Sequence, residues 1–191
     1  LGLTRCGTTS HGVSIGWAHE LAAALHQHYG HEVLNTARAG MQTGDIASKL
    51  LEDKVLLTKP DVVVIAFSLG TSEIELHMMQ NEAAAQRSCD SFMEGIRELV
   101  NLVVAIEAVP VVCECYPNYV CECYHHGMFT AMHYTALKDT NRRLEAFRVP
   151  ILPMLEAVDD GSGRWKQGFS HDAAHPNAAG HHEMFRGQVP S

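Results

Sequence analysis

The sequence has few basic side chains and no long apolar run, and each absence excludes a class of function. It holds 14 Lys and Arg against 22 Asp and Glu, which gives a formal net charge of −8. Nucleic-acid-binding surfaces need clustered basic residues, whereas these are scattered, so we expect no nucleic-acid partner. No run approaches the roughly 18 consecutive apolar residues of a membrane-spanning helix, so we expect no membrane span.

The N-terminus has neither an initiator methionine nor a recognisable signal peptide. The chain begins at Leu1 and Gly2, which we interpret as the end of a strand. We therefore expect one domain over residues 1–191 that lacks most of its first strand. A signal segment before Leu1 is compatible with this interpretation, because a missing start would conceal it.

Six cysteines do not indicate a disulfide framework, because 191 residues can build a core without such cross-links. Free thiols are the simpler interpretation, and they slightly favour a cytoplasmic location. Four cysteines and two histidines gather in CECYPNYVCECYHH, residues 113–126. Thiolates and imidazoles bind zinc, but C-x-C pairs are less typical of zinc sites, and buried cysteine is a common core residue. Strand alternation would place Cys113 and Cys115 on one face.

Helical and strand-like patterns alternate along the chain. The patterns, with Gly30 as a C-cap and Asn177 as an N-cap, predict helices over 16–30, 43–57, 89–107, 129–147 and from 177 to 185. Short apolar runs predict strands over 31–35, 61–70, 109–116 and 149–154. The run at 61–70 suits a strand buried on both faces, as in a parallel sheet. The alternation predicts an α/β fold, a three-layer α/β/α sandwich with a central parallel sheet.

Polar loops follow the predicted strands, and one more polar segment precedes the last helix. That segment carries Asp172 and His175. A carboxylate that holds one ring nitrogen of a histidine fixes the tautomer in which the other nitrogen can act as a base. This spacing alone is more often a helix cap beside a surface residue, but the loops at 1–7, 35–40 and 69–73 share one edge of the predicted sheet. The sequence therefore predicts an acid–base site at that edge.

Four blocks of the chain, in order, resemble those of the SGNH (GDSL-type) hydrolases. Asn35 to Gly40 resembles the family's Asn-x-x-x-x-Gly block, and Asp172 with His175 and Pro176 resembles its last block, Asp-x-x-His-Pro. The resemblance spans nearly the whole chain and implies a flavodoxin-like fold that cleaves carboxylic esters without a cofactor. It implies that His175 is the base, that Asp172 orients it, and that the Gly40 N–H contributes to the oxyanion hole.

The other two blocks depart from the family pattern. Ser72 occupies the position of the family's oxyanion-hole asparagine, so a hydroxyl would replace an amide donor. The first block lacks the family's nucleophilic serine. Aligning Gly2 with the family's glycine puts Thr4 at the nucleophile position, and this is the alignment we favour. A second alignment puts Thr8 there, and Ser10 could serve only if the loop differs from the family's.

These features predict an ester hydrolase of the SGNH type. The Thr4 hydroxyl would attack the acyl carbonyl while His175 takes its proton and returns it to the leaving alcohol. The expected substrates are small molecules, acyl or acetyl esters of small alcohols or carbohydrates. A threonine methyl crowds the attack, so one alternative is a catalytically impaired SGNH-fold protein that binds ligands in the same cleft. A zinc-binding module at Cys113–Cys123 is the second, and no oligomeric state is predicted.

Overall fold

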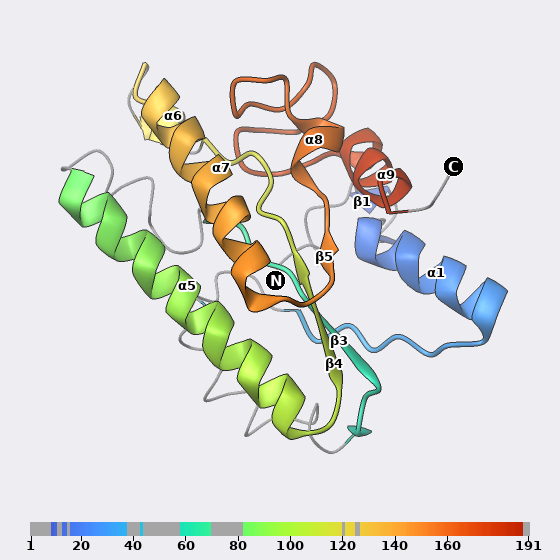
Figure 1. Cartoon of the computed structure of the whole chain (residues 1–191). Coiled ribbons are helices and arrows are strands. Elements are labelled where there is room, and N and C mark those ends of the chain that lie inside the picture. Colours follow the sequence, from blue (N-terminus) through green and yellow to red (C-terminus); the bar gives the residue numbers. More distant parts are fainter. Residues whose placement is uncertain are drawn as a thin grey trace.

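The computed structural model describes residues 9–10, 13–14, 16–37, 43, 58–69, 82–119, 121–124 and 127–188. Three short parallel strands form its centre (Figure 1), in the order β3 (Val62–Ile65), β4 (Val109–Cys113) and β5 (Ile151–Leu152). Val62 pairs with Val109, and Val112 pairs with Ile151. The predicted central parallel sheet is confirmed.

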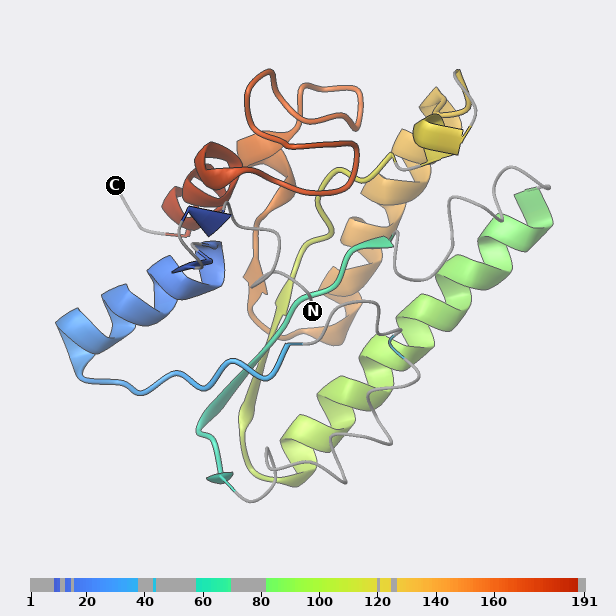
Figure 2. The ribbon, with the colours of Figure 1, turned by 180° about the vertical axis from the view of Figure 1, so that it is seen from behind.

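Helices cover both faces of this sheet (Figure 2). On one face lie α5 (Glu82–Ala105) and α7 (Ala131–Leu144), and on the other lie α1 (Trp17–Tyr29), α8 (Leu155–Val158) and α9 (Ala178–Arg186). Each face has its own buried apolar cluster: one joins β3 and β4 to Ile96 and Leu137, and the other joins Trp17 to Met154 and Met184. This is the expected α/β/α arrangement.

The remaining described elements are small. An antiparallel hairpin, β1 (Thr9–Ser10) and β2 (Val13–Ser14), precedes α1. A single helical turn, α6 (Cys121–Tyr124), follows β4, and a 3-10 helix, η2 (Glu145–Phe147), extends α7. Within the described residues, no helix is both long and apolar enough to cross a membrane.

Helix boundaries agree with the predicted caps. Helix α1 ends at Gly30, whose φ of 71° is the left-handed conformation that glycine adopts without strain. Helix α9 starts after Asn177, whose side-chain oxygen accepts a hydrogen bond from the Gly180 N–H at 3.0 Å. Of the predicted helix at 43–57, only Thr43 lies within the described residues, and it is helical.

Two strand predictions need correction. Residues 31–35 form no strand, and Val33 and Leu34 are 48% and 63% exposed. The predicted strand at 61–70 is regular only as β3, and its Val62 and Val64 are 52% and 41% exposed rather than buried on both faces. The cluster that includes Trp17 packs on Cys113 and Leu152, at the carboxyl ends of the strands, so the beginning of β3 is left uncovered on that side.

The cysteines of β4 and the residues after it divide between the two faces. Strand β4 ends at Cys113, which packs with Trp17, whereas Cys115 packs with the α5 side of the core. The expectation that both share one face is therefore wrong, because strand alternation stops before Cys115. The Asn141 side chain there bonds both the Cys115 N–H (2.8 Å) and its carbonyl (2.9 Å).

The described cysteines behave as core residues. Four of them are buried free thiols: Cys89, Cys113, Cys115 and Cys121. Burial raises the pKa of Cys113 to about 12 and raises that of Cys115 as well, so both thiols stay protonated. No group of three or more His, Cys, Asp and Glu side chains within the described residues could hold a metal ion. The Cys123 side chain, His125 and His126 lie outside that part.

Candidate active site

Asp172 and His175 lie in a closed turn directly before α9. The His171 N–H donates to the His175 carbonyl at 2.9 Å, and the Asn177 N–H donates to the Phe169 carbonyl at 3.0 Å. Ser170 and Pro176 form an isolated antiparallel bridge. Backbone bonds on both sides of the turn therefore hold its ends together.

Within the turn, the side chains of Asp172 and His175 face each other. His175 Nδ1 lies 2.9 Å from Oδ2 and 3.0 Å from Oδ1 of Asp172. An ionised carboxylate only accepts hydrogen bonds, so Nδ1 is the ring nitrogen that donates here, and Nε2 lies on the other side of the ring. The side chains of His175 and Asp172 are 49% and 52% exposed, so Nε2 can be reached from solution. The contact with Asp172 holds the His175 ring in one orientation.

The Asp172 carboxylate is held by the turn itself. Its Oδ1 accepts the backbone N–H groups of Ala174 and His175, each at 2.8 Å. Partial burial alone would raise the pKa of Asp172, but hydrogen bonds from the His175 side chain and these two N–H groups outweigh it and lower the pKa. The carboxylate is therefore ionised at neutral pH, as an orienting partner for His175 must be.

This turn lies at the carboxyl edge of the sheet. The loop that leaves β4 reaches it, because the Tyr119 N–H donates to the Ala173 carbonyl at 3.0 Å. One residue earlier, the Asn118 amide donates to Ser68 Oγ at 3.4 Å, which joins the loops after β4 and β3. The edge is the one at which the loops of α/β folds carry function, as the sequence predicted.

The N-terminal part of the chain comes to the same side. Hairpin β1–β2 ends at Ser14, shortly before Trp17, and Trp17 packs in one buried cluster with Met184 of α9. On the surface of these helices, His182 Nδ1 lies 2.7 Å from Glu20 Oε2. Helices α1 and α9, which lie far apart in the sequence, are thus packed together, and α9 directly follows the Asp172–His175 turn.

A model of the GDSL-like lipase/acylhydrolase family matches residues 3–183. The chain belongs to this family. Membership confirms the family recognised from the motifs and the class of ester hydrolase expected from them. No protein among the curated sequences matches this GDSL-like chain.

Solved structures with the same fold include enzymes that act on esters. The GDSL-like chain superposes on the acetylxylan esterase Axe2 of Geobacillus stearothermophilus with a TM-score of 0.65 and 17% identity, over 97% of this chain and 88% of that one. A GDSL-like lipase of Bacteroides thetaiotaomicron gives 0.64 and 15%, over 97% and 80%. The α/β hydrolase LAE5 from the metagenome of Lake Arreo, Spain, gives 0.66 and 17%, over 97% and 88%. At these identities the likeness shows the fold.

The other predicted site residues of this GDSL-like chain are not among those the structure describes. The predicted nucleophile Thr4, its alternative Thr8, and the oxyanion-hole residues Gly40 and Ser72 lie outside the described residues. Ser10 is described only as backbone, paired with Val13 in the β1–β2 hairpin. The structure thus brings the His175 ring against the Asp172 carboxylate, and the catalytic roles of all seven residues stay predictions.

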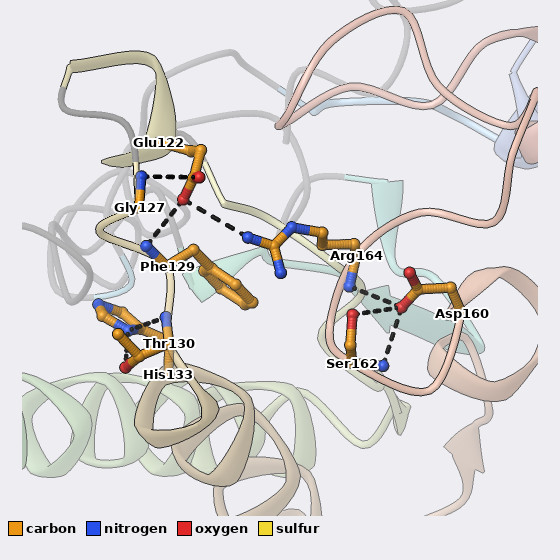
Figure 3. Close-up of polar contacts among 8 residues, drawn as sticks. All are labelled: Glu122, Gly127, Phe129, Thr130, His133, Asp160, Ser162 and Arg164. Carbon is orange, nitrogen blue, oxygen red and sulfur yellow. Dashed lines mark hydrogen bonds and ion pairs between the residues drawn. The ribbon is translucent and has the colours of Figure 1, made fainter.

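The loop that follows α8, in which no site residue was predicted, is closed by its own polar side chains. In residues 159–165, Asp160 Oδ1 accepts the Ser162 N–H (2.8 Å), the Ser162 hydroxyl (2.7 Å) and the Arg164 N–H (3.3 Å), as Figure 3 shows. These bonds lower the pKa of Asp160 against the opposing effect of its partial burial. The composition Asp-Asp-Gly-Ser-Gly was the available signal, because short polar residues and glycine favour tight side-chain-capped turns.

The same loop is fastened to the segment after β4. The Arg164 guanidinium lies 3.5 Å from Glu122 Oε2, and its centre is 5.0 Å from the ring centroid of Phe129 (Figure 3). The same centre is 5.5 Å from the ring centroid of Tyr119. Glu122 also accepts the Phe129 N–H at 2.8 Å. Cation–π and ion-pair contacts therefore connect this loop to the segment after β4.

Proposed function

We propose that this GDSL-like chain hydrolyses carboxylic esters through a hydroxyl nucleophile, with His175 as general base and Asp172 as its orienting partner. The observation that carries the proposal is the Asp172–His175 geometry, in which Asp172 holds Nδ1 and leaves Nε2 of a half-exposed ring at the carboxyl edge of the sheet. Catalysis of this kind needs that nitrogen within hydrogen-bond reach of the attacking hydroxyl.

The remaining roles follow the sequence resemblance. Thr4 attacks the acyl carbonyl, with Thr8 and Ser10 as the alternative nucleophiles. The backbone N–H of Gly40 and the Ser72 hydroxyl stabilise the oxyanion, and water then releases the acyl group. The packing of α1 against α9 supports this assignment, because it holds the N-terminal part of the chain beside the helix that follows His175.

Small acyl or acetyl esters are the proposed substrates, with a small alcohol or a carbohydrate as the leaving group. The fold shared with an acetylxylan esterase supports the choice of acetylated carbohydrates as the first substrates to test. Release of acetate from acetylated xylo-oligosaccharides, compared with release from acetate esters of simple alcohols, would separate the two leaving groups.

Hydrolysis of p-nitrophenyl acetate by the wild type and by His175→Ala tests the proposal. Removal of a general base is expected to lower kcat by about 10²- to 10⁴-fold. The matched control is His182→Ala, because His182 is also exposed and also lies against a carboxylate, 2.7 Å from Glu20, but on α9. Activity of His182→Ala should stay within about twofold of the wild type. A wild type no faster than His175→Ala would refute the proposal.

Replacement of Thr4, Thr8 and Ser10 by alanine, one at a time, identifies the nucleophile. The true nucleophile is the position whose alanine variant loses activity to the level of His175→Ala. A wild type that binds acetylated glycans but hydrolyses none would favour the impaired, ligand-binding alternative. Stoichiometric zinc in the purified protein would favour the alternative at Cys113–Cys123.

A further inference from the structure

We propose that Trp165 is a positioning residue for the Asp172–His175 pair, acting through one peptide group. This inference rests on the proposed hydrolysis for its kinetic consequence, but its structural content can be tested separately. The indole Nε1–H of Trp165 donates to the Ala173 carbonyl at 3.3 Å. The Tyr119 N–H donates to the same carbonyl at 3.0 Å.

The bonded carbonyl belongs to the peptide group that steadies Asp172. The Ala173 C=O and the Ala174 N–H are parts of one planar peptide unit. That N–H donates to Asp172 Oδ1 at 2.8 Å, and Asp172 in turn holds His175 Nδ1. A rotation of the plane that broke the Trp165 bond would therefore also break a bond to the orienting carboxylate. Donors on the carbonyl further polarise the amide and strengthen its N–H as a donor.

Trp165 is itself held rigidly enough to act in this way. Its side chain is buried, its ring lies 5.6 Å from that of Tyr116, and it packs in the cluster with Met154 and Met184. On the backbone, Trp165 forms a bridge with Asp159, and the next residue, Lys166, donates its N–H to the Val158 carbonyl at 2.8 Å. The indole donor is therefore fixed before the substrate binds.

The chain contains a matched control in its other tryptophan. Trp17 is 2% exposed and packs in the same buried cluster as Trp165. Its Nε1 is buried without a hydrogen-bond partner in the described part of the chain. Phe in place of either tryptophan loses similar packing, but only Trp165→Phe removes a hydrogen bond to the turn.

Kinetics of p-nitrophenyl acetate hydrolysis give the first test. Trp165→Phe should lower kcat about 3- to 10-fold while KM stays within twofold, which is the effect of losing one hydrogen bond of ordinary strength. Trp17→Phe should change kcat less than twofold. Equal effects of the two variants would overturn the proposal, because packing alone would then explain them.

A spectroscopic test does not depend on activity. With two tryptophans in the chain, the indole N–H signals in a ¹⁵N-labelled sample can be assigned from the two Phe variants. Asp172→Ala, in a protein that keeps Trp165, should shift the Trp165 indole signal and leave that of Trp17 in place. A Trp165 indole signal that does not move on Asp172→Ala would overturn the proposal, even if Trp165→Phe fails to fold. If the wild type has no esterase activity but Asp172→Ala still shifts the Trp165 indole signal, the coupling is supported and the proposed function fails.

Discussion

At the scale of single residues, Asp172 depends on short-range bonds for its ionised state. Both of its backbone donors and its histidine partner lie within the next three residues. The lowered pKa of this carboxyl makes its folded-state value lower than its unfolded value, so its contribution to stability is complete above the unfolded pKa of about 3.9 and disappears as pH falls through the folded value.

Asp172→Asn should therefore destabilise the protein at pH 7 and less at pH 3, where more of the wild-type carboxyl is protonated. The loss at pH 7 should be at most about 1 kcal/mol, because the carboxylate is half-exposed and its attraction to His175 is screened by solvent. Urea unfolding at the two pH values measures it. Asp139→Asn, which affects an exposed ion pair with Arg142 on α7, is the control. An equal loss at both pH values for Asp172→Asn would contradict this account.

At the scale of elements, the start of α9 is packed directly against the turn that it follows. A Cβ added to Gly180 would lie 2.1 Å from the Phe169 carbonyl oxygen and 3.1 Å from Pro176 Cβ. The close approach is needed because Asn177 bonds the Gly180 N–H on one side and the Gly168 carbonyl on the other. Glycine at this position therefore lets the helix pack directly against the Asp172–His175 turn.

Gly180→Ala should destabilise the protein by about 1–3 kcal/mol, although alanine favours helix, because the backbone oxygen cannot move aside cheaply. Thermal unfolding measures the loss. Gly187→Ala at the other end of α9 is the control: the nearest atoms to its added Cβ are at 3.6 Å, and its φ of −61° suits alanine. That variant should be neutral or slightly more stable. A Gly180→Ala protein as stable as Gly187→Ala would show that the turn can shift freely.

At the scale of the whole molecule, the two buried clusters lie on opposite faces of one small sheet. Both tryptophans lie in the cluster with α9, whereas α5 and α7 pack on the other. Strand β4 contributes to both clusters, through Val112 on one face and Cys113 on the other. If residues 1–191 form one domain, unfolding of the cluster on one face of the sheet should also unfold the cluster on the other face.

Urea unfolding followed by tryptophan fluorescence and by far-ultraviolet circular dichroism should therefore give coincident transitions. Fluorescence reports the face with Trp17 and Trp165, while the dichroism is dominated by long helices such as α5. The reversible range is checked by refolding from high urea. Two separated midpoints would contradict the single-domain proposal.

The sequence by itself determined the features that depend on interactions within a few residues. The end of α1 at Gly30, the start of α9 at Asn177 and the pairing of Asp172 with His175 all depend on bonds between near neighbours, so a local pattern predicts them. The alternation of helices and strands likewise predicted the parallel sheet.

Only the tertiary structure decided the features that depend on which distant segments meet. Coverage of the sheet by α1 and its neighbours decides the exposure of Val62 and the irregular backbone at 31–35. The residue at which β4 ends decides that Cys113 and Cys115 pack on opposite faces. The bond from Trp165 to Ala173 joins two loops whose approach requires the packed core beneath them. Local propensity fixes backbone geometry over a turn or two, whereas burial and long-range hydrogen bonds exist only after the chain has closed on itself.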